Sequence, residues 1–594
     1  MPTENIAARL EAVRAALKKQ GLDGFVIPIT DEHASEYVAD YAQRLAWISN
    51  FKGSAGTGVV MVDKAAIFVD GRYTIQVRQQ VDGALFEYCH LIDNPPIKWL
   101  KTQAKKGQKI GYDPFLHTIG WVASAKKALA TKGAELVATD NVIDAAWDDQ
   151  PGEPNTPVTP RADKYVGKSH QEKRAQIAAA IREKDAEAAI ITQLDSIAWL
   201  FNFRSQDVNH TPVSLAFAII DGNGHATLYI DDSKVSIELK KHLGNEIGIA
   251  PKHEFLDGVR ALGKSGKIVL ADPGTASSAI FDALTESGAQ IVKGLDPVAL
   301  PKATKNDVEL DGTRAAHIRD GAAVAKFLHW FSIEAPGGGL DEMAAEKKIR
   351  EFREENGDLL DLSFDTISAA GPNGALCHYK LTPETNLPIL LNSVFLIDSG
   401  GQYIDGTTDI TRTVAVGNPG DEARDRFTRV LKGHIALATV KFPKGTVGTE
   451  LDSFARRPLW DAGLDYDHGT GHGVGVFLAV HEGPGRISKA PNPIALVPGM
   501  IYSNEPGYYK AGEYGIRIEN LVIVRAEDLG GEQEMMGLET ITFAPIDKNM
   551  IKLDLLTEGE KTWFNDYHAE VWEKLSPLLE GDAKDWVQEA TSPL

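Results

Sequence analysis

Two aspartates in the second half of the chain stand at positions where paired strands could bring their carboxylates together. Asp398 ends the apolar run 393–397, and Asp409 follows eleven residues later in a threonine-rich stretch. The residues between them, 399–403, have the composition of a turn, so the two segments could pair as antiparallel strands. Two carboxylates a few ångströms apart repel each other unless a proton or a cation lies between them. Taken singly, each aspartate is more simply a turn residue.

A histidine and two glutamates add further ligand types. His472 lies in the glycine-rich stretch 468–475, where glycines remove side-chain bulk and let the backbone approach a ligand closely. On its own this stretch could equally be a loop with solvent-exposed imidazoles. Glu505 ends another apolar run, and Glu519 follows Arg517 by two residues, so on a strand both side chains would share one face.

Taken together, these segments predict a metal site rather than separate structural features. Four carboxylates and one imidazole are mostly hard oxygen ligands, which suit two divalent cations such as Mn²⁺. A structural zinc site would instead favour cysteine and histidine. The predicted ligands are Asp398, Asp409, His472, Glu505 and Glu519.

The composition excludes several classes of protein. Among the 594 residues, 43% are hydrophobic and 24% are charged, which is typical of a soluble globular protein. No apolar run approaches the roughly 20 residues that a membrane helix needs, so we expect no membrane association. A net charge of −21, from 83 acidic and 62 basic residues, makes nucleic acid a poor partner.

The cellular compartment is predicted from the cysteines and the N-terminus. Only Cys89 and Cys377 are present, too few for a disulfide framework, and this number fits a reducing compartment. The first residues lack the basic and apolar regions of a signal peptide, so we do not expect secretion. These observations together predict a cytoplasmic protein.

The order of patterns along the chain predicts a duplicated front half. An amphipathic helix, a buried strand and a hairpin of two short strands occur before residue 70, and they recur in the same order about 150 residues later. The segment 45–51, LAWISNF, matches the segment 197–203, IAWLFNF. We therefore predict four regions: α/β domains at 1–155 and 156–304, a mixed domain at 305–538, and a helical extension at 539–594 that packs on the third domain.

Several stretches resemble the metallopeptidases of the pita-bread (creatinase/aminopeptidase) fold, and the whole length resembles the three-domain Xaa-Pro aminopeptidase branch. The matching stretches are 31–37, 51–57, 70–73, 398–400, 405–409, 468–475, 480–484 and 565–572. The resemblance implies an α/β (α+β) protein with two creatinase-type N-terminal domains and a C-terminal pita-bread catalytic domain. It also implies that a hydroxide bridging two metal ions cleaves the N-terminal Xaa-Pro bond of peptides.

The resemblance assigns roles to the candidate ligands. Asp409 and Glu519 would bridge the two metals, Asp398 would complete one site, and His472 with Glu505 would complete the other. Glu505 would also take up and return protons during the attack of water on the scissile carbonyl.

The resemblance adds candidate substrate residues. His378 and His481 would bind substrate and stabilise the tetrahedral intermediate or shuttle protons. A proline pocket would be formed by His468, Tyr509 and Arg517.

A dimer is also expected from the family. Arg72 and Tyr37 fall in matched stretches of the first domain, and we expect them to reach a partner subunit or to cap the active-site entrance. A fold-stabilising ion pair and a core tyrosine are the alternatives for these two residues.

Other members of this fold class remain alternatives. A prolidase shares the metal ligands but cleaves only dipeptides, and a methionine aminopeptidase needs no long N-terminal region. A creatine amidinohydrolase has the fold without metals, and a non-catalytic peptide-binding or histone-binding protein has no need to keep the ligands. The duplicated front half and the full set of five ligands favour the Xaa-Pro aminopeptidase.

Overall fold

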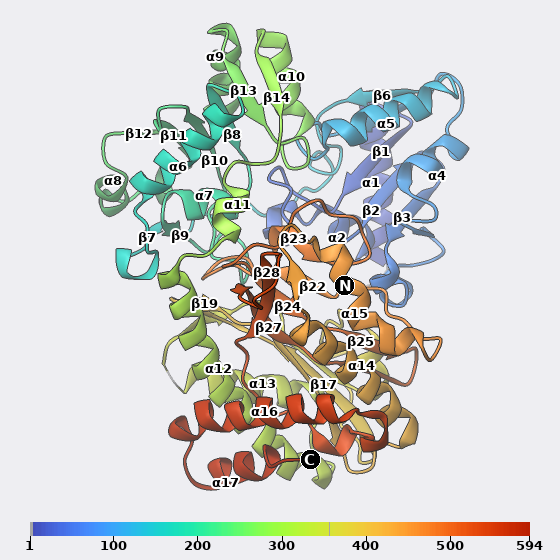
Figure 1. The fold of residues 1–594 in the computed structure, drawn as a ribbon. Helices are drawn as coiled ribbons and strands as arrows, with labels where there is room; N and C mark the ends of the chain where they lie inside the picture. The colour runs from blue at the N-terminus through green and yellow to red at the C-terminus, as the bar shows by residue number, and fades with distance from the viewer. Residues whose placement is uncertain (1–3, 356) are drawn as a thin grey trace. The chain divides into compact units, whose positions relative to one another are not determined.

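The computed structural model describes residues 4–355 and 357–594 (Figure 1). Residues 1–3, the start of the predicted first domain, lie outside the described residues. The chain divides into two compact units, one formed by Met1–Asp163 with Lys168–Ala299 and the other by Lys164–Gly167 with Leu300–Leu594. Within the described part of the chain, no helix is both long and apolar enough to cross a membrane.

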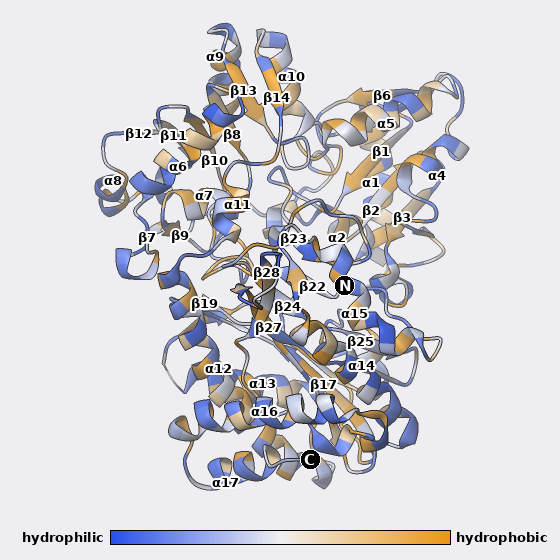
Figure 2. Ribbon diagram, viewed as in Figure 1, coloured by the Kyte–Doolittle hydropathy of each residue, from blue (hydrophilic) through white to orange (hydrophobic). Residues whose placement is uncertain are grey.

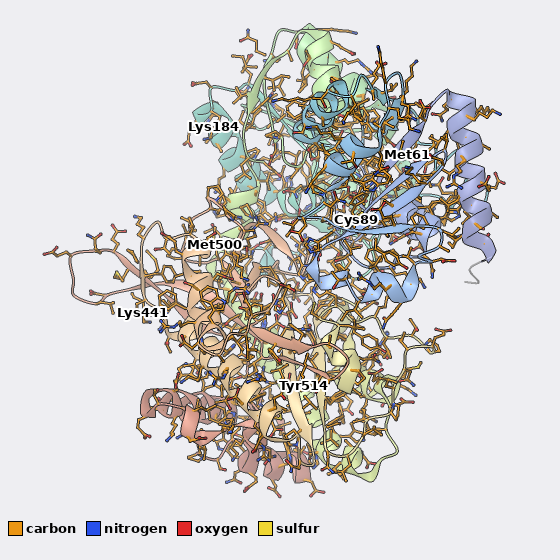
Figure 3. All side chains as sticks on the ribbon, turned by 90° about the vertical axis from the view of Figure 1, so that its right-hand side faces the viewer. Met61, Cys89, Lys184, Lys441, Met500 and Tyr514 are labelled. Carbon is orange, nitrogen blue, oxygen red and sulfur yellow. The ribbon has the colours of Figure 1, made fainter. Side chains whose placement is uncertain are left out.

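The first sheet of the N-terminal unit has six strands in the order β4-β3-β2-β1-β5-β6. The strands are β1 (Gly24–Pro28), β2 (Thr57–Met61), β3 (Ala65–Val69), β4 (Glu87–His90), β5 (Lys109–Tyr112) and β6 (Glu135–Ala138). Side chains alternate between its two faces: Phe25 packs with helix α1 (Glu4–Gln20), whereas Val26 packs with α4 (Pro96–Gln103) and α5 (Ile119–Ala130). Figure 3 labels Met61 and Cys89, which both belong to the second of these clusters.

The second sheet repeats the arrangement of the first, with the order β12-β11-β10-β8-β13-β14. Its strands are β8 (Ala188–Ile191), β10 (Ala216–Asp221), β11 (Ala226–Ile230), β12 (Ile247–Ala250), β13 (Ile268–Ala271) and β14 (Gln290–Lys293). The central strand pairs antiparallel with a hairpin on one side and parallel with a later strand on the other, in both sheets. The equal pairing patterns support the duplication predicted from the sequence.

The second unit is built on short antiparallel sheets. One contains β16 (Ile367–Ala370), β17 (Ser393–Ser399) and β20 (Ile410–Val416), and a small one contains β15 (Leu359–Leu362), β18 (Gly401–Tyr403) and β19 (Gly406–Thr407). A six-stranded sheet has the order β21-β28-β27-β24-β22-β23. Its strands are β21 (Phe442–Pro443), β22 (Gly471–Gly473), β23 (Glu482–Ile487), β24 (Ile501–Asn504), β27 (Asn520–Glu527) and β28 (Met535–Thr540). The hairpin β25 (Gly507–Lys510) and β26 (Tyr514–Arg517) pairs separately.

Helices cover the sheets of this second unit. The main ones are α12 (Asp307–Glu334), α13 (Glu342–Glu354), α14 (Asp421–Thr439), α15 (Gly448–Trp460), α16 (Glu558–Leu575) and α17 (Gly581–Ala590). The C-terminal helices α16 and α17 pack against α12, and their buried side chains join a core cluster shared with α14 (Figure 1). Figure 2 shows β1 and β17 as largely apolar, which matches their burial on both faces.

Candidate metal centre

The two aspartates belong to segments that pair as antiparallel strands, as the sequence predicted, although the connection differs from the expected turn. Asp398 on β17 is directly opposite Thr411 on the antiparallel strand β20. Asp409 immediately precedes β20 and is 4% exposed. Between them the chain forms the hairpin β18–β19 instead of a simple turn, because the residues after Gly400 pair with β15.

The glycines around His472 let the neighbouring strands approach closely. His472 lies on β22, and a Cβ on Gly471 would lie 2.1 Å from the carbonyl oxygen of Ser503. A Cβ on Gly473 would lie 2.3 Å from the carbonyl oxygen of Glu482. The glycines therefore permit close contact with these strands, and the close approach of a ligand stays a prediction.

The imidazole of His472 is held in one orientation by its neighbours. Its Nδ1 lies 2.9 Å from the Gly473 carbonyl oxygen, so Nδ1–H donates and Nε2 is left as the acceptor. Nε2 lies 3.5 Å from Asp409 Oδ2 and 3.6 Å from Glu505 Oε1. The ring face of His481 is close, with the two ring centroids 4.3 Å apart.

Hydroxyl groups hold Glu505 and Glu519 in position. Each hydroxyl belongs to a residue two positions away from a candidate ligand. Ser503, on β24, donates through its hydroxyl to Glu505 Oε1 at 3.1 Å. Thr411 donates through its hydroxyl to Glu519 Oε2 at 2.8 Å. Ligand-type atoms of Asp409, His472 and Glu519 all lie within 4.8 Å of one another.

The electrostatics of this group show an excess of negative charge. Burial raises the pKa of Asp398 to about 6, although Arg517 opposes this shift. Burial and the neighbouring carboxylates Asp409 and Asp398 also raise the pKa of Glu519 well above its usual range. Burial alone would lower the pKa of His472, but the carboxylates Asp409 and Glu505 raise it to about 9.

The predicted proline-pocket residues form a hydrogen-bonded chain that begins at Asp398. Arg517 Nη2 donates to Asp398 Oδ2, and its Nη1 donates to the Tyr509 hydroxyl at 2.7 Å. The Tyr509 hydroxyl lies 2.8 Å from His468 Nε2, and His468 Nδ1 lies 2.7 Å from the Gly469 carbonyl oxygen. At each link of this chain one donor meets one acceptor, so the four side chains are held as one unit.

Comparisons with known proteins identify the family. The model for metallopeptidase family M24 matches residues 311–526, and that for the C-terminal region of peptidase M24 matches 534–594. Two creatinase/prolidase N-terminal domain models match 9–146 and 149–309. A probable Xaa-Pro aminopeptidase P of Laccaria bicolor is 40% identical over 610 residues, covering 100% of this chain and 94% of that protein. The chain belongs to metallopeptidase family M24.

Further relatives place the chain in the three-domain branch of this family. Aminopeptidase P2 of Arabidopsis thaliana is 40% identical and covers 99% of this chain and 88% of that one. The crystal structure of X-prolyl aminopeptidase from Caenorhabditis elegans, described as a cytosolic enzyme with a di-nuclear active site, is 33% identical. It superposes with a TM-score of 0.94, covering 99% of this chain and 100% of that one. The predicted pita-bread fold with creatinase-type N-terminal domains is thereby confirmed.

The remaining candidates lie in different surroundings. His378 and His481 are each half-buried and belong to the same unit as the acidic group. His378 follows the short helix η7 (Gly371–Ala375), and His481 immediately precedes β23. Arg72 belongs to the N-terminal unit, where its Nη2 donates to Asp70 Oδ2 at 2.7 Å. That ion pair is the alternative that the sequence left open for Arg72, whereas a substrate-binding role stays a prediction.

Sequence reasoning missed Thr411 and Arg412. Thr411 lies two residues after Asp409, so an alternating pattern could have placed it on the same face. Arg412 is 1% exposed and donates to the carbonyl oxygens of Thr411 and Glu519 at 2.9 and 2.7 Å. No sequence signal marks Arg412, because its partners are backbone carbonyls, the amide oxygen of Asn520 and the hydroxyl of Tyr567 in the C-terminal extension.

Proposed function

We propose that this chain is a metal-dependent aminopeptidase that releases the N-terminal residue of peptides whose second residue is proline. The observation that carries the proposal is a group of four carboxylates with His472, whose Nε2 lies 3.5 Å from an oxygen of Asp409 and 3.6 Å from an oxygen of Glu505. It occurs in a chain whose whole length is similar to proteins named Xaa-Pro aminopeptidase. Such a group needs compensating positive charge, and divalent cations supply it.

The proposed ligands of two divalent cations are Asp398, Asp409, His472, Glu505 and Glu519. Two observations support a fit to cations. The Oδ1 of Asp398 is buried without a hydrogen-bond partner, and the tautomer of His472 leaves Nε2 directed at carboxylates. We propose Mn²⁺ as the metal, because the donors are mainly hard oxygen atoms. Bound divalent cations would lower the pKa of a water molecule from about 16 towards 7 and so supply a nucleophile at neutral pH.

The proposed roles of the surrounding residues follow the resemblance to the family. Glu505 takes up and returns protons, and the Ser503 hydroxyl holds one of its oxygens in place. His378 and His481 bind the substrate and stabilise the negative charge that develops on the carbonyl oxygen. The free amine of the substrate lies near the acidic group, which favours release of a terminal residue over internal cleavage.

Specificity for proline is proposed to come from His468, Tyr509 and Arg517. An Xaa-Pro amide has no N–H, so an enzyme that relies on a hydrogen bond to that group cannot use this substrate. The hydrogen-bonded chain of these three side chains is rigid and can therefore form a shaped wall for the proline ring. We also propose a substrate-binding role for Arg72, because it lies in a stretch that resembles the family.

We propose that the protein is a homodimer in the cytoplasm. Its proposed partners are peptides, and neither nucleic acid nor a membrane is proposed as a partner. The Caenorhabditis elegans relative is described as cytosolic. Cys89 and Cys377 are both buried, and no disulfide joins them, which fits a reducing compartment. The dimer is proposed from the family alone, and its measurement is the molar mass in solution.

A substrate comparison tests the proposed function. Metal-free protein is supplied with Mn²⁺ and incubated with Arg-Pro-Pro, Arg-Pro and Met-Ala-Ser, and the products are identified by mass spectrometry. Cleavage of the first bond of Arg-Pro-Pro alone is the expected result. Preference for Arg-Pro would indicate a prolidase instead, and preference for Met-Ala-Ser a methionine aminopeptidase. The absence of metal-dependent turnover on all three would overturn the proposal.

A further inference from the structure

A fully buried glutamate on α13 has no role in the acidic group. Glu342 is 0% exposed, and each of its oxygens accepts hydrogen bonds from groups outside its own helix. Oε1 accepts from the Ala370 backbone N–H at 2.7 Å and from Asn373 Nδ2 at 3.0 Å. Oε2 accepts from the Tyr379 hydroxyl at 2.8 Å and from the Leu387 backbone N–H at 2.9 Å.

The charge of this carboxylate is not balanced by a cation. Among the residues that the structure describes, no lysine, arginine or histidine forms an ion pair with Glu342. Burial raises the pKa of Glu342, while the donors from Ala370 and Leu387 lower it. Burying a carboxylate without a cation costs free energy, and a residue needed only for packing would avoid that cost.

The four donors all come from one segment of the chain. Ala370 ends β16, Leu387 lies at the far end, and Asn373 and Tyr379 lie between them. The segment also closes on itself, because Asn373 Nδ2 donates to the Thr385 carbonyl oxygen at 2.9 Å and the Tyr379 hydroxyl lies 2.9 Å from the Thr385 hydroxyl. We call residues 371–387 the His378 loop, because His378 immediately precedes Tyr379 within it. Glu342 thus holds both ends and the middle of this loop.

The His378 loop also lies against the strand that carries Arg517. A Cβ on Gly515 of β26 would lie 1.7 Å from the Gly374 carbonyl oxygen, so the two backbones are in direct contact. Cys377, next to His378, is close enough to Tyr509 to raise the pKa of its hydroxyl, together with burial and against the effect of Arg517. The loop therefore approaches the proposed proline pocket at Cys377, the residue before His378.

We propose that Glu342 is a positioning residue, which fixes the His378 loop so that the imidazole of His378 is presented to the substrate. Only a carboxylate offers enough acceptor sites to receive four donors that converge from separate parts of a loop. The inference rests on the proposed function, since His378 contacts a substrate only if the chain is such an aminopeptidase. Glu342 itself does not touch the substrate.

A double-mutant cycle measures whether Glu342 acts through His378. Values of kcat/KM for Arg-Pro-Pro are compared among the wild-type protein, Glu342→Gln, His378→Ala and the double variant, all with Mn²⁺. We expect Glu342→Gln to lower kcat/KM about 10-fold in the wild-type background, because the amide presents an N–H to donors. In the His378→Ala background the same change should lower it by no more than about 2-fold.

Two further variants serve as controls. Glu342→Gln combined with His481→Ala should retain the full effect of about 10-fold, since His481 lies on another segment. Glu346→Gln, one helical turn along α13, makes the same chemical change without a hydrogen bond to the loop and should leave kcat/KM unchanged. Equal losses in the wild-type and His378→Ala backgrounds would overturn the proposal and leave Glu342 with a purely structural role.

Hydrogen exchange separates a failure of this inference from a failure of the proposed function. In metal-free protein, Glu342→Gln should accelerate amide exchange within 371–387 and leave 501–510 unchanged. Unchanged exchange within 371–387 would overturn the inference whatever the substrate. A wild-type protein without turnover would overturn the proposed function. Accelerated exchange in its Glu342→Gln variant would still support the inference that Glu342 holds the loop. If Glu342→Gln does not fold, Tyr379→Phe, which removes one of the four donors, replaces it in both experiments with the same expected direction.

Discussion

Two buried acidic sites, one in each unit of the chain, have opposite surroundings. In the N-terminal unit, Asp207 and Lys234 have side chains 0% and 1% exposed, and Lys234 Nζ donates to Asp207 Oδ2 at 2.6 Å. Asp207 Oδ2 also accepts from the Ser214 hydroxyl and the Leu215 backbone N–H, at 3.0 and 2.8 Å. Its charge is therefore balanced by one cation and its oxygen is well satisfied by donors.

The acidic group of the second unit lacks this balance. Four carboxylates face the guanidinium of Arg517 and the imidazole of His472, and Asp398 Oδ1 has no hydrogen-bond partner. A balanced buried pair contributes to the fold, whereas an excess of buried charge costs stability unless a ligand supplies the missing charge. The comparison teaches that compensation, more than burial, distinguishes a structural carboxylate from a binding one.

The largest effect is expected from Glu505→Gln, which removes one charge and one proton-accepting oxygen from the acidic group. We expect kcat for Arg-Pro-Pro with Mn²⁺ to fall about 10³-fold, because proton transfer by a positioned carboxylate contributes about that factor. The near-UV circular dichroism should stay unchanged. A variant that retains more than a tenth of the wild-type kcat would contradict the assigned role.

The next effect concerns the balanced pair in the N-terminal unit. Lys234→Met should lower the free energy of unfolding by about 3–5 kcal/mol, because Asp207 would be left as an uncompensated buried charge. Urea denaturation followed by tryptophan fluorescence measures the loss. Lys184→Met, at an exposed position in the same domain that Figure 3 labels, is the control and should change stability by about 0.5 kcal/mol or less. Equal effects of the two variants would show that the pair contributes little.

Metal removal tests the missing charge directly. With free Mn²⁺ at about 100 times its dissociation constant, binding should stabilise the native protein by about 2.7 kcal/mol, and EDTA should reverse the gain. Differential scanning calorimetry with and without Mn²⁺ measures this change. The gain should largely vanish in His472→Ala, since that variant lacks the only predicted nitrogen ligand. A transition that does not respond to Mn²⁺ in the wild-type protein would argue against a metal centre.

The smallest effect is expected from Glu519→Gln in metal-free protein. A carboxyl whose folded pKa is raised destabilises the native state above its unfolded pKa, and the cost grows as pH rises towards the folded pKa. The variant should therefore melt about 2 °C higher than wild type at pH 7.5. At pH 4 the two proteins should melt at the same temperature. The Thr411 hydroxyl can still donate to the amide oxygen. A lower melting temperature for the variant at pH 7.5 would mean that Glu519 is compensated without metal.

Much of the fold could be predicted because it depends on local patterns. The amphipathic helix and the buried strand predicted before residue 70 correspond to α1 and β1, since helical spacing and apolar runs are properties of contiguous residues. The link after Asp398 was predicted as a turn and forms the hairpin β18–β19 instead. Its pairing with β15 depends on residues about 40 positions earlier, so local composition could not indicate it.

The candidate site, like the fold, could be predicted only in part from the sequence. The candidate ligands were found because Asp398 and Glu505 interrupt apolar runs at strand ends, where a charged residue is conspicuous. Arg412 and Glu342 were missed because each bonds to groups far away in the sequence, mostly backbone N–H and C=O groups, which every residue carries. From the sequence alone, a charged residue in a helix, such as Glu342, is expected to be exposed to solvent.

The sequence by itself determined the duplicated N-terminal architecture, the family and the five candidate ligands, because residue type and short-range spacing carry that information. Only the tertiary structure decided which carboxylates are compensated. It set Lys234 against Asp207 and left Asp398 Oδ1 without a partner, and it placed the His378 loop around Glu342. The physical reason is that charge balance and hydrogen-bond satisfaction depend on distances between segments, which no single stretch of sequence specifies.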